Sequence, residues 1–136
     1  MRAADQLAVA ELWLAKAKTD LALARVILKK GPDMEPWAAG FHAQQAAEKS
    51  MKAVLVAEGI EPPRDHNLVA LKSMLPADLK LGVSMKTLAS LSAMARGVRY
   101  VTELDDPDEP TWTEAEEAVA GAQTIMDATA AKVSGK

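Results

Sequence analysis

The stretch of sequence that decides the fold is FHAQQAAEKSMKAVLVAEG, residues 41–59. Placed on a helix at about 100° per residue, it separates into two faces. We expect a helix from about Pro36 to Glu58, because proline stands in its first turn and Gly59 directly follows its end. One face is apolar and consists of Ala43, Ala46, Ala47, Met51, Ala53, Val54 and Ala57.

The other face of this helix carries a line of polar residues, Gln45, Glu48, Lys49 and Lys52, with Phe41, Leu55 and Val56 between them. Charged residues at such spacings usually form a solvated stripe stabilised by Glu–Lys pairs. The interleaved apolar residues favour an alternative, in which the polar line is covered and forms a buried network or a groove. Asp20 falls almost in line with the apolar stripe of the preceding helix, where a carboxylate needs a cation such as Lys49. On this second interpretation, Asp20, Gln45 and Glu48 hold the helices in register.

Prolines and glycines divide the rest of the chain into further helical segments. The first segment has a helical stripe of Trp13, Ala17, Leu21, Ala24 and Leu28. The last segment begins near Thr111, with capping-box spacing either from Thr111 to Glu114 or from Thr113 to Glu116. The remaining bounds are about Ala4–Lys29 for the first helix, Asn67–Leu75 for a short third and Ser84–Leu104 for a fourth.

The fold class follows from these segments. Alanine is frequent in all of them and runs of β-branched residues are lacking, so no strand is expected. Long amphipathic helices joined by short loops bury their stripes against one another. We therefore predict one all-α domain over residues 1–136, an antiparallel up-down four-helix bundle with an additional short helix, five helices in all. The tail from Ser134 to Lys136 is expected to fray.

Composition excludes several classes of function. The 136 residues include no cysteine, which excludes disulfides, zinc fingers and thiol catalysis, and no metal or other cofactor is expected. The net charge of −3 provides no general attraction for nucleic acid or for a membrane surface. No segment resembles a membrane span, and the N-terminus carries Asp5 and Glu11 where a signal peptide would be basic and then apolar. A cytoplasmic protein is predicted.

Two short segments are candidates for binding an anion. The loop EPPRDHNLVAL, residues 61–71, presents Arg64 and His66 just before a helix, where a phosphate would find a guanidinium and free backbone amides. The simpler interpretation is that Asp65 or Asn67 caps the helix, while His66 packs on the bundle and Arg64 is solvated. The segment MARGVRY, residues 94–100, places Arg96 and Arg99 on one face with Tyr100 nearby, a weak signature for a phosphate or a nucleobase.

Together these residues resemble the HEPN superfamily (higher eukaryotes and prokaryotes nucleotide-binding). The resemblance rests on the AxxDLxxAR pattern over residues 17–25, the block over 41–59, the block PRDHNLVAL over 63–71, and the Arg99–Tyr100 pair. It implies a short all-α bundle. Catalytic members resemble metal-independent ribonucleases that use an Arg followed, after four to six residues, by a His. No His stands at that distance after Arg96 or Arg99. No catalytic residue is therefore predicted.

The other branch of the superfamily resembles non-catalytic partners of minimal nucleotidyltransferases, in toxin–antitoxin or resistance-type modules. That resemblance implies a homodimer that binds a nucleotide or another anion, although the usual Arg-Tyr-Pro element is absent because Val101 follows Tyr100. The alternatives are a degenerate ribonuclease toxin, with His66 in an acid–base role, and a structural dimerisation scaffold. The predicted groove draws on Lys49, Lys52, Arg64, His66, Arg99 and Tyr100.

Overall fold

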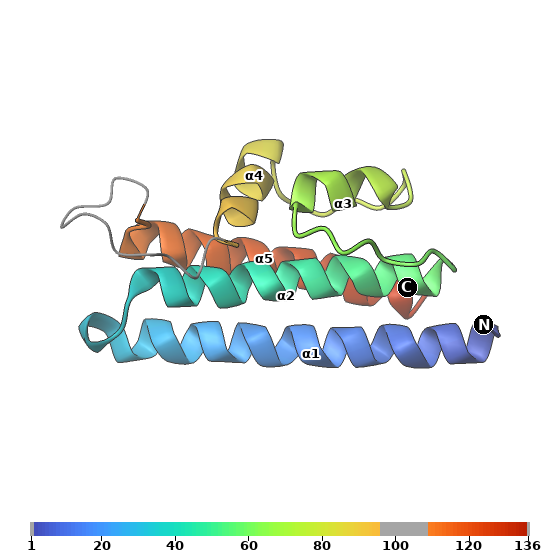
Figure 1. Ribbon diagram of the computed structural model, residues 1–136, viewed down its shortest axis with the longest axis horizontal. Helices are drawn as coiled ribbons and strands as arrows, with labels where there is room; N and C mark the ends of the chain where they lie inside the picture. The colour runs from blue at the N-terminus through green and yellow to red at the C-terminus, as the bar shows by residue number, and fades with distance from the viewer. Residues whose placement is uncertain (1, 96–108, 136) are drawn as a thin grey trace.

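The computed structural model describes residues 2–95 and 109–135, and this part of the chain is all-α (Figure 1). Five α-helices lie in it, and no strand is found among the described residues. A short 3-10 turn, Gly31–Asp33, links the first two helices. The helices are α1 (Ala3–Lys30), α2 (Pro36–Ala57), α3 (Leu68–Met74), α4 (Met85–Ala93) and α5 (Trp112–Val133).

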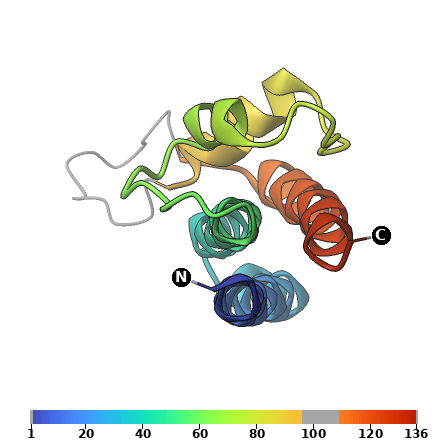
Figure 2. The same ribbon diagram turned by 90° about the vertical axis from the view of Figure 1, so that its right-hand side faces the viewer.

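Helix α2 is the central element of the fold. It packs on α1, on α5 and on the pair α3 and α4, as the end-on view in Figure 2 shows. Helices α1 and α2 are antiparallel, and α5 runs in the same direction as α2 (Figure 1). The chain returns between α2 and α5 through the loop over residues 58–67, which runs back along α2, and through the short helices α3 and α4.

Most helix bounds agree with the predicted ones within one or two residues, and the predicted fold class is confirmed. The fourth helix is the exception. The periodicity suggested Ser84–Leu104, whereas α4 ends at Ala93 and Met94 and Ala95 form a turn. The remainder of that predicted helix, from residue 96 to 104, lies outside the described residues. Within the described part, α1, α2 and α5 are long and α4 is not.

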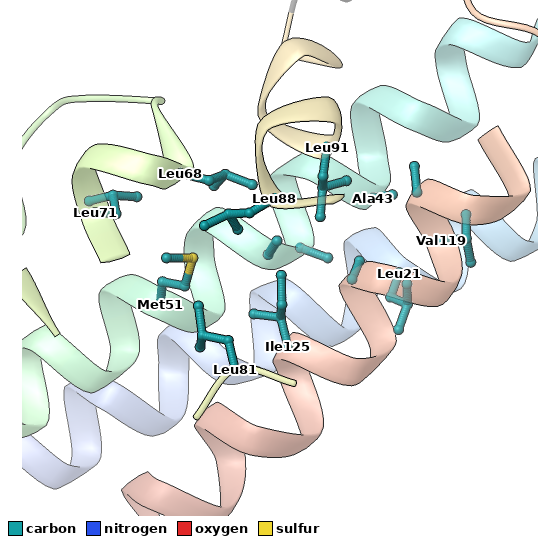
Figure 3. Packing of buried hydrophobic residues seen from close by; sticks show 14 of the residues in the cluster. Leu21, Ala43, Met51, Leu68, Leu71, Leu81, Leu88, Leu91, Val119 and Ile125 are labelled. Carbon is teal, nitrogen blue, oxygen red and sulfur yellow. The ribbon is translucent and has the colours of Figure 1, made fainter. Parts of the chain in front are cut away.

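The main core lies where α2 meets α5, α3 and α4 (Figure 3). The predicted apolar face of α2 is buried there, and its alanines allow the neighbouring helices to approach closely. Gly40 on α2 is an example of such a close approach, because a Cβ added to it would lie only 2.7 Å from Met94 Sδ. The large side chains that fill this core include Met51, Leu55, Leu68, Leu88, Leu91 and Ile125.

The N-terminus of α5 offers a test of the capping box. Thr111 Oγ1 accepts a hydrogen bond from the Glu114 amide at 3.1 Å, and Glu114 Oε1 accepts one from the Thr111 amide at 3.0 Å. We expect Thr111→Ala to lower the free energy of unfolding by about 1 kcal/mol, measured by urea denaturation. Thr113→Ala is the matched control and should cost nothing, because Thr113 is exposed and α5 is capped at Thr111. Equal losses in the two variants would contradict this assignment.

Candidate functional site

The polar line of α2 contains a buried carboxylate that binds a lysine with one oxygen and a histidine with the other. Glu48 Oε2 accepts a hydrogen bond from Lys52 Nζ at 3.1 Å, and Glu48 Oε1 lies 2.8 Å from His66 Nδ1. Because an ionised carboxylate only accepts hydrogen bonds, this contact assigns the proton to Nδ1 of His66. The Nε2 atom of the same ring is thereby directed away from Glu48.

A second carboxylate repeats the arrangement between α1 and α2. Asp20 on α1 contacts Lys49 Nζ through Oδ2 at 2.5 Å and His42 Nδ1 through Oδ1 at 3.0 Å. His42 and Lys49 lie seven residues apart on α2, hence on one side of it. The sequence predicted that Asp20, in the apolar stripe of α1, needs a cation such as Lys49, and the structure shows this pair. This cluster joins α1 to α2 through two charged contacts.

Gln44 attaches the loop over residues 58–67 to α2. Its Nε2 donates to Glu48 Oε1 and to the carbonyl oxygen of His66, each at 3.1 Å. Its Oε1 accepts from Gln45 Nε2 at 2.7 Å. Asn67 caps the following helix, since its side chain accepts from the amides of the next turn. Both the backbone and the ring of His66 are therefore held in place.

Burial differs sharply between the members of these clusters. The side chains of Glu48 and Lys52 are only 5% and 7% exposed, and Lys52 Nζ lies 5.9 Å from the centre of the Trp13 ring. A solvated stripe is therefore the wrong interpretation for this part of α2. The His66 side chain, in contrast, is 67% exposed. The hydrogen-bonded network that Glu48 forms with Lys52, Gln44 and His66 therefore runs from the interior to the surface. No buried side-chain polar atom in the described residues lacks a hydrogen-bond partner.

The residues predicted to bind a ligand fall into three groups. Lys49 and Lys52 are each bound to a carboxylate. Arg64 and His66 are exposed in the loop before α3. Arg99 and Tyr100, like Arg96, lie outside the described residues, and the structure does not bear on them.

Sequence reasoning missed two members of the network, His42 and Gln44. Gln44 stands four residues before Glu48, and His42 stands seven before Lys49. Both spacings place the pairs on one side of a helix, which was the available signal. The spacing does not predict where α1 and the loop lie relative to α2. The partners of His42 and Gln44 outside α2 come from these two elements.

Beside His66 lies an open hollow of about 410 Å³ between the start of α3 and helix α4. Its wall includes Ser92, whose Oγ accepts from the Leu68 amide at 3.0 Å. A larger hollow of about 760 Å³ lies between α4 and α5, but Glu109, Glu114 and Glu117 line it with Lys86 as a single cation in the described lining. The described lining of the smaller hollow includes His66 and no carboxylate, so an anion meets less opposing charge there. The described residues contain no cluster of three side chains suited to hold a metal ion.

These features define a class of small helical-bundle domain, in which polar residues of the second helix bind the first helix and the loop that follows. The family model of the HEPN domain matches residues 10–133, and the chain belongs to this family. None of the described helices is both long and apolar enough to cross a membrane.

Two solved structures resemble the chain over nearly its whole length. The crystal structure of TT1696 from Thermus thermophilus is 28% identical, with a TM-score of 0.69, over 90% of this chain and 97% of that one. The structure of ST0689, described as an archaeal HEPN homologue, is 25% identical, with a TM-score of 0.64, over 91% and 97%. A comparison with curated proteins finds no match.

Proposed function

We propose that the chain is a binding subunit that holds a nucleotide, or another phosphate-bearing anion, at the exposed loop formed by Arg64 and His66. The observation that carries this proposal is the state of His66. Its Nδ1 atom is held by the buried Glu48, while the ring is 67% exposed and lines the hollow beside α4. An imidazole fixed in this way presents its Nε2 atom to a ligand with little loss of side-chain entropy, and it donates to a phosphate oxygen in the imidazolium form, in which both ring nitrogens carry a proton.

The charges next to His66 are mixed, with Arg64 favouring an anion and Asp65 opposing it. Lys52 neutralises Glu48, so that the carboxylate behind the imidazole is compensated. Asp65 Oδ1 accepts from the Asn67 amide and is thereby held within the loop. Arg64 brings a guanidinium two residues before His66, on a segment stiffened by Pro62 and Pro63. In this proposal Lys49 and Lys52 contribute indirectly, by holding the carboxylates that orient the two histidines.

Isothermal titration calorimetry with ATP, and separately with tripolyphosphate, tests the site and separates recognition of the base from that of the phosphates. We expect Arg64→Ala and His66→Gln each to weaken binding by about ten-fold or more, since each removes a hydrogen bond to a charged group. Lys72→Ala is the matched control, an exposed cation on α3 that should leave the affinity unchanged. The proposal fails if millimolar ATP and tripolyphosphate give no heat, or if the three variants behave alike.

The proposal extends to a protein partner. The 136 residues contain no nucleotidyltransferase motif, and we assign a transferase reaction to a partner protein. We propose a separate minimal nucleotidyltransferase, in a toxin–antitoxin or resistance-type module. Size-exclusion chromatography with light scattering, on the chain alone and mixed with a nucleotidyltransferase encoded by the neighbouring gene, should show a stable hetero-complex. Independent elution of the two proteins would reject this partner.

One observation favours a second candidate function, RNA cleavage. An imidazole held by a carboxylate is the usual arrangement for a general acid or base, and His66 has it. Incubation with RNA should then give cleavage that His66→Ala abolishes. Intact RNA after prolonged incubation would reject this candidate and leave the binding function.

A further inference from the structure

Helix α1 carries large apolar side chains on the side that faces away from the rest of the molecule. Leu12, Val26 and Leu23 are 63%, 51% and 43% exposed. At about 100° per residue the three fall within about 60° of one another around the helix. Helix α1 packs on α2 and α5 with its opposite side, through Ala17, Leu21 and Ala24 among others. In both overall views α1 forms one margin of the molecule (Figures 1 and 2).

The outer face of α1 is self-complementary. Asp5 and Lys30 lie on this face at opposite ends of the helix, beyond the apolar residues. If a second α1 packs against it in the antiparallel direction, the register that places Leu12 opposite Leu23 also places Asp5 opposite Lys30. A two-fold axis then produces each of these contacts twice, as an isologous interface requires.

We infer that the outer face of α1 is the interface of an antiparallel two-fold dimer of this chain. Its middle is lined by small residues, Ala15, Thr19 and Ala22, which allow two helices to approach closely. At the same 100° per residue, Lys16 falls within this face close to Leu23, and Lys18 lies beside the face, so that in the dimer both extend their ammonium groups into solvent along the edge of the interface. The salt bridge of Asp5 with the exposed Arg2 leaves Asp5 half exposed and available to Lys30 of a second copy.

The inferred dimer is compatible with ligand binding and independent of it. Helix α1 lies on one side of α2, while the loop with Arg64 and His66 runs along another side, next to α3 (Figures 1 and 2). A dimer through α1 would therefore carry two outward-facing loops. Variants of α1 should change the oligomeric state and leave the affinity for ATP or tripolyphosphate as it is, which separates a failure of this inference from a failure of the proposed function.

Disulfide trapping tests the register, because the chain has no cysteine of its own. We expect a mixture of Leu12→Cys and Leu23→Cys to form a disulfide-linked dimer that contains one copy of each. Either variant alone should not cross-link, since like positions in this register lie eleven residues apart, about 16 Å along the helices, far beyond disulfide reach. Met85→Cys, exposed on α4, is the control and should cross-link with neither variant.

Sedimentation equilibrium tests the association itself. The unmodified chain should have the mass of a dimer at about 100 µM, a concentration at which even a modest interface is populated. Leu23→Glu should be monomeric, while Met85→Glu stays dimeric. Asp5→Lys and Lys30→Glu should each weaken the dimer several-fold, and combining them should restore it. A monomeric unmodified chain, cross-linking of Leu12→Cys with itself, or a double charge reversal that restores nothing would each overturn the inference.

Discussion

Replacement of Glu48 by alanine is expected to lower the free energy of unfolding by about 3–5 kcal/mol. The reason is the burial of the pair, because the variant leaves the Lys52 ammonium only 7% exposed and without its carboxylate. His66 and Gln44 lose an acceptor at the same time. A loss of this size is a large fraction of the 5–15 kcal/mol that usually stabilises a domain. Thermal and urea denaturation followed by circular dichroism measure it, with a fall in Tm of roughly 10 °C or more.

Two further variants separate charge from shape at Glu48, and a third serves as a control. Glu48→Gln keeps the volume and part of the hydrogen bonding, so its loss should be smaller. Combining Glu48→Leu with Lys52→Leu removes both charges and should recover most of the stability, because apolar residues of similar volume often replace a buried ion pair without cost. Glu116→Ala removes an exposed carboxylate of α5 and should change stability by no more than about 0.5 kcal/mol. If Glu48→Ala is as mild as Glu116→Ala, the network does not have the burial assigned to it.

The same network decides how the binding variants can be interpreted. Without its ring, residue 66 is still held by the Gln44 side chain through its backbone carbonyl. Glu48 also keeps Lys52 and Gln44 as donors. His66→Gln and His66→Ala should therefore fold, and a loss of affinity in either reports on the exposed ring. Glu48 variants give no such clean information, because they remove the support of the loop together with the orientation of His66.

Local sequence patterns account for most of the helices but for few of the contacts within the site. The apolar faces of α1 and α2 and the cap at Thr111 are periodic or short-range features, which a single sequence displays directly. Short-range patterns do not predict the burial of Lys52, because it depends on Trp13, about three turns into another helix, and on a loop that folds back over α2. The predicted fourth helix, Ser84–Leu104, differs from the structure at Met94 and Ala95, and its residues 96–104 lie outside the described part of the chain. Its periodicity continues past Ala93, whereas the described chain turns at Met94.

The second large effect is expected at Asp20, which contacts a lysine and a histidine as Glu48 does, although its cluster is less buried. Asp20→Ala should cost about 1–3 kcal/mol, the penalty for removing hydrogen bonds to charged groups. The loss is smaller than for Glu48 because Lys49 and His42 are 25% and 33% exposed, so water can hydrate both once the carboxylate is gone. Urea denaturation of the two variants under one set of conditions compares them directly.

Two companion variants test whether burial sets this order. Asp20→Asn keeps the shape and can still contact Lys49 and His42, so it should lie between the unmodified chain and Asp20→Ala. Asp5→Ala removes an exposed carboxylate from the same helix and should have little effect on the stability of the monomer. If Asp20→Ala proves more damaging than Glu48→Ala, desolvation of the stranded lysine is not the dominant penalty. The contact between α1 and α2 would then carry more of the stability than the loop that covers Glu48.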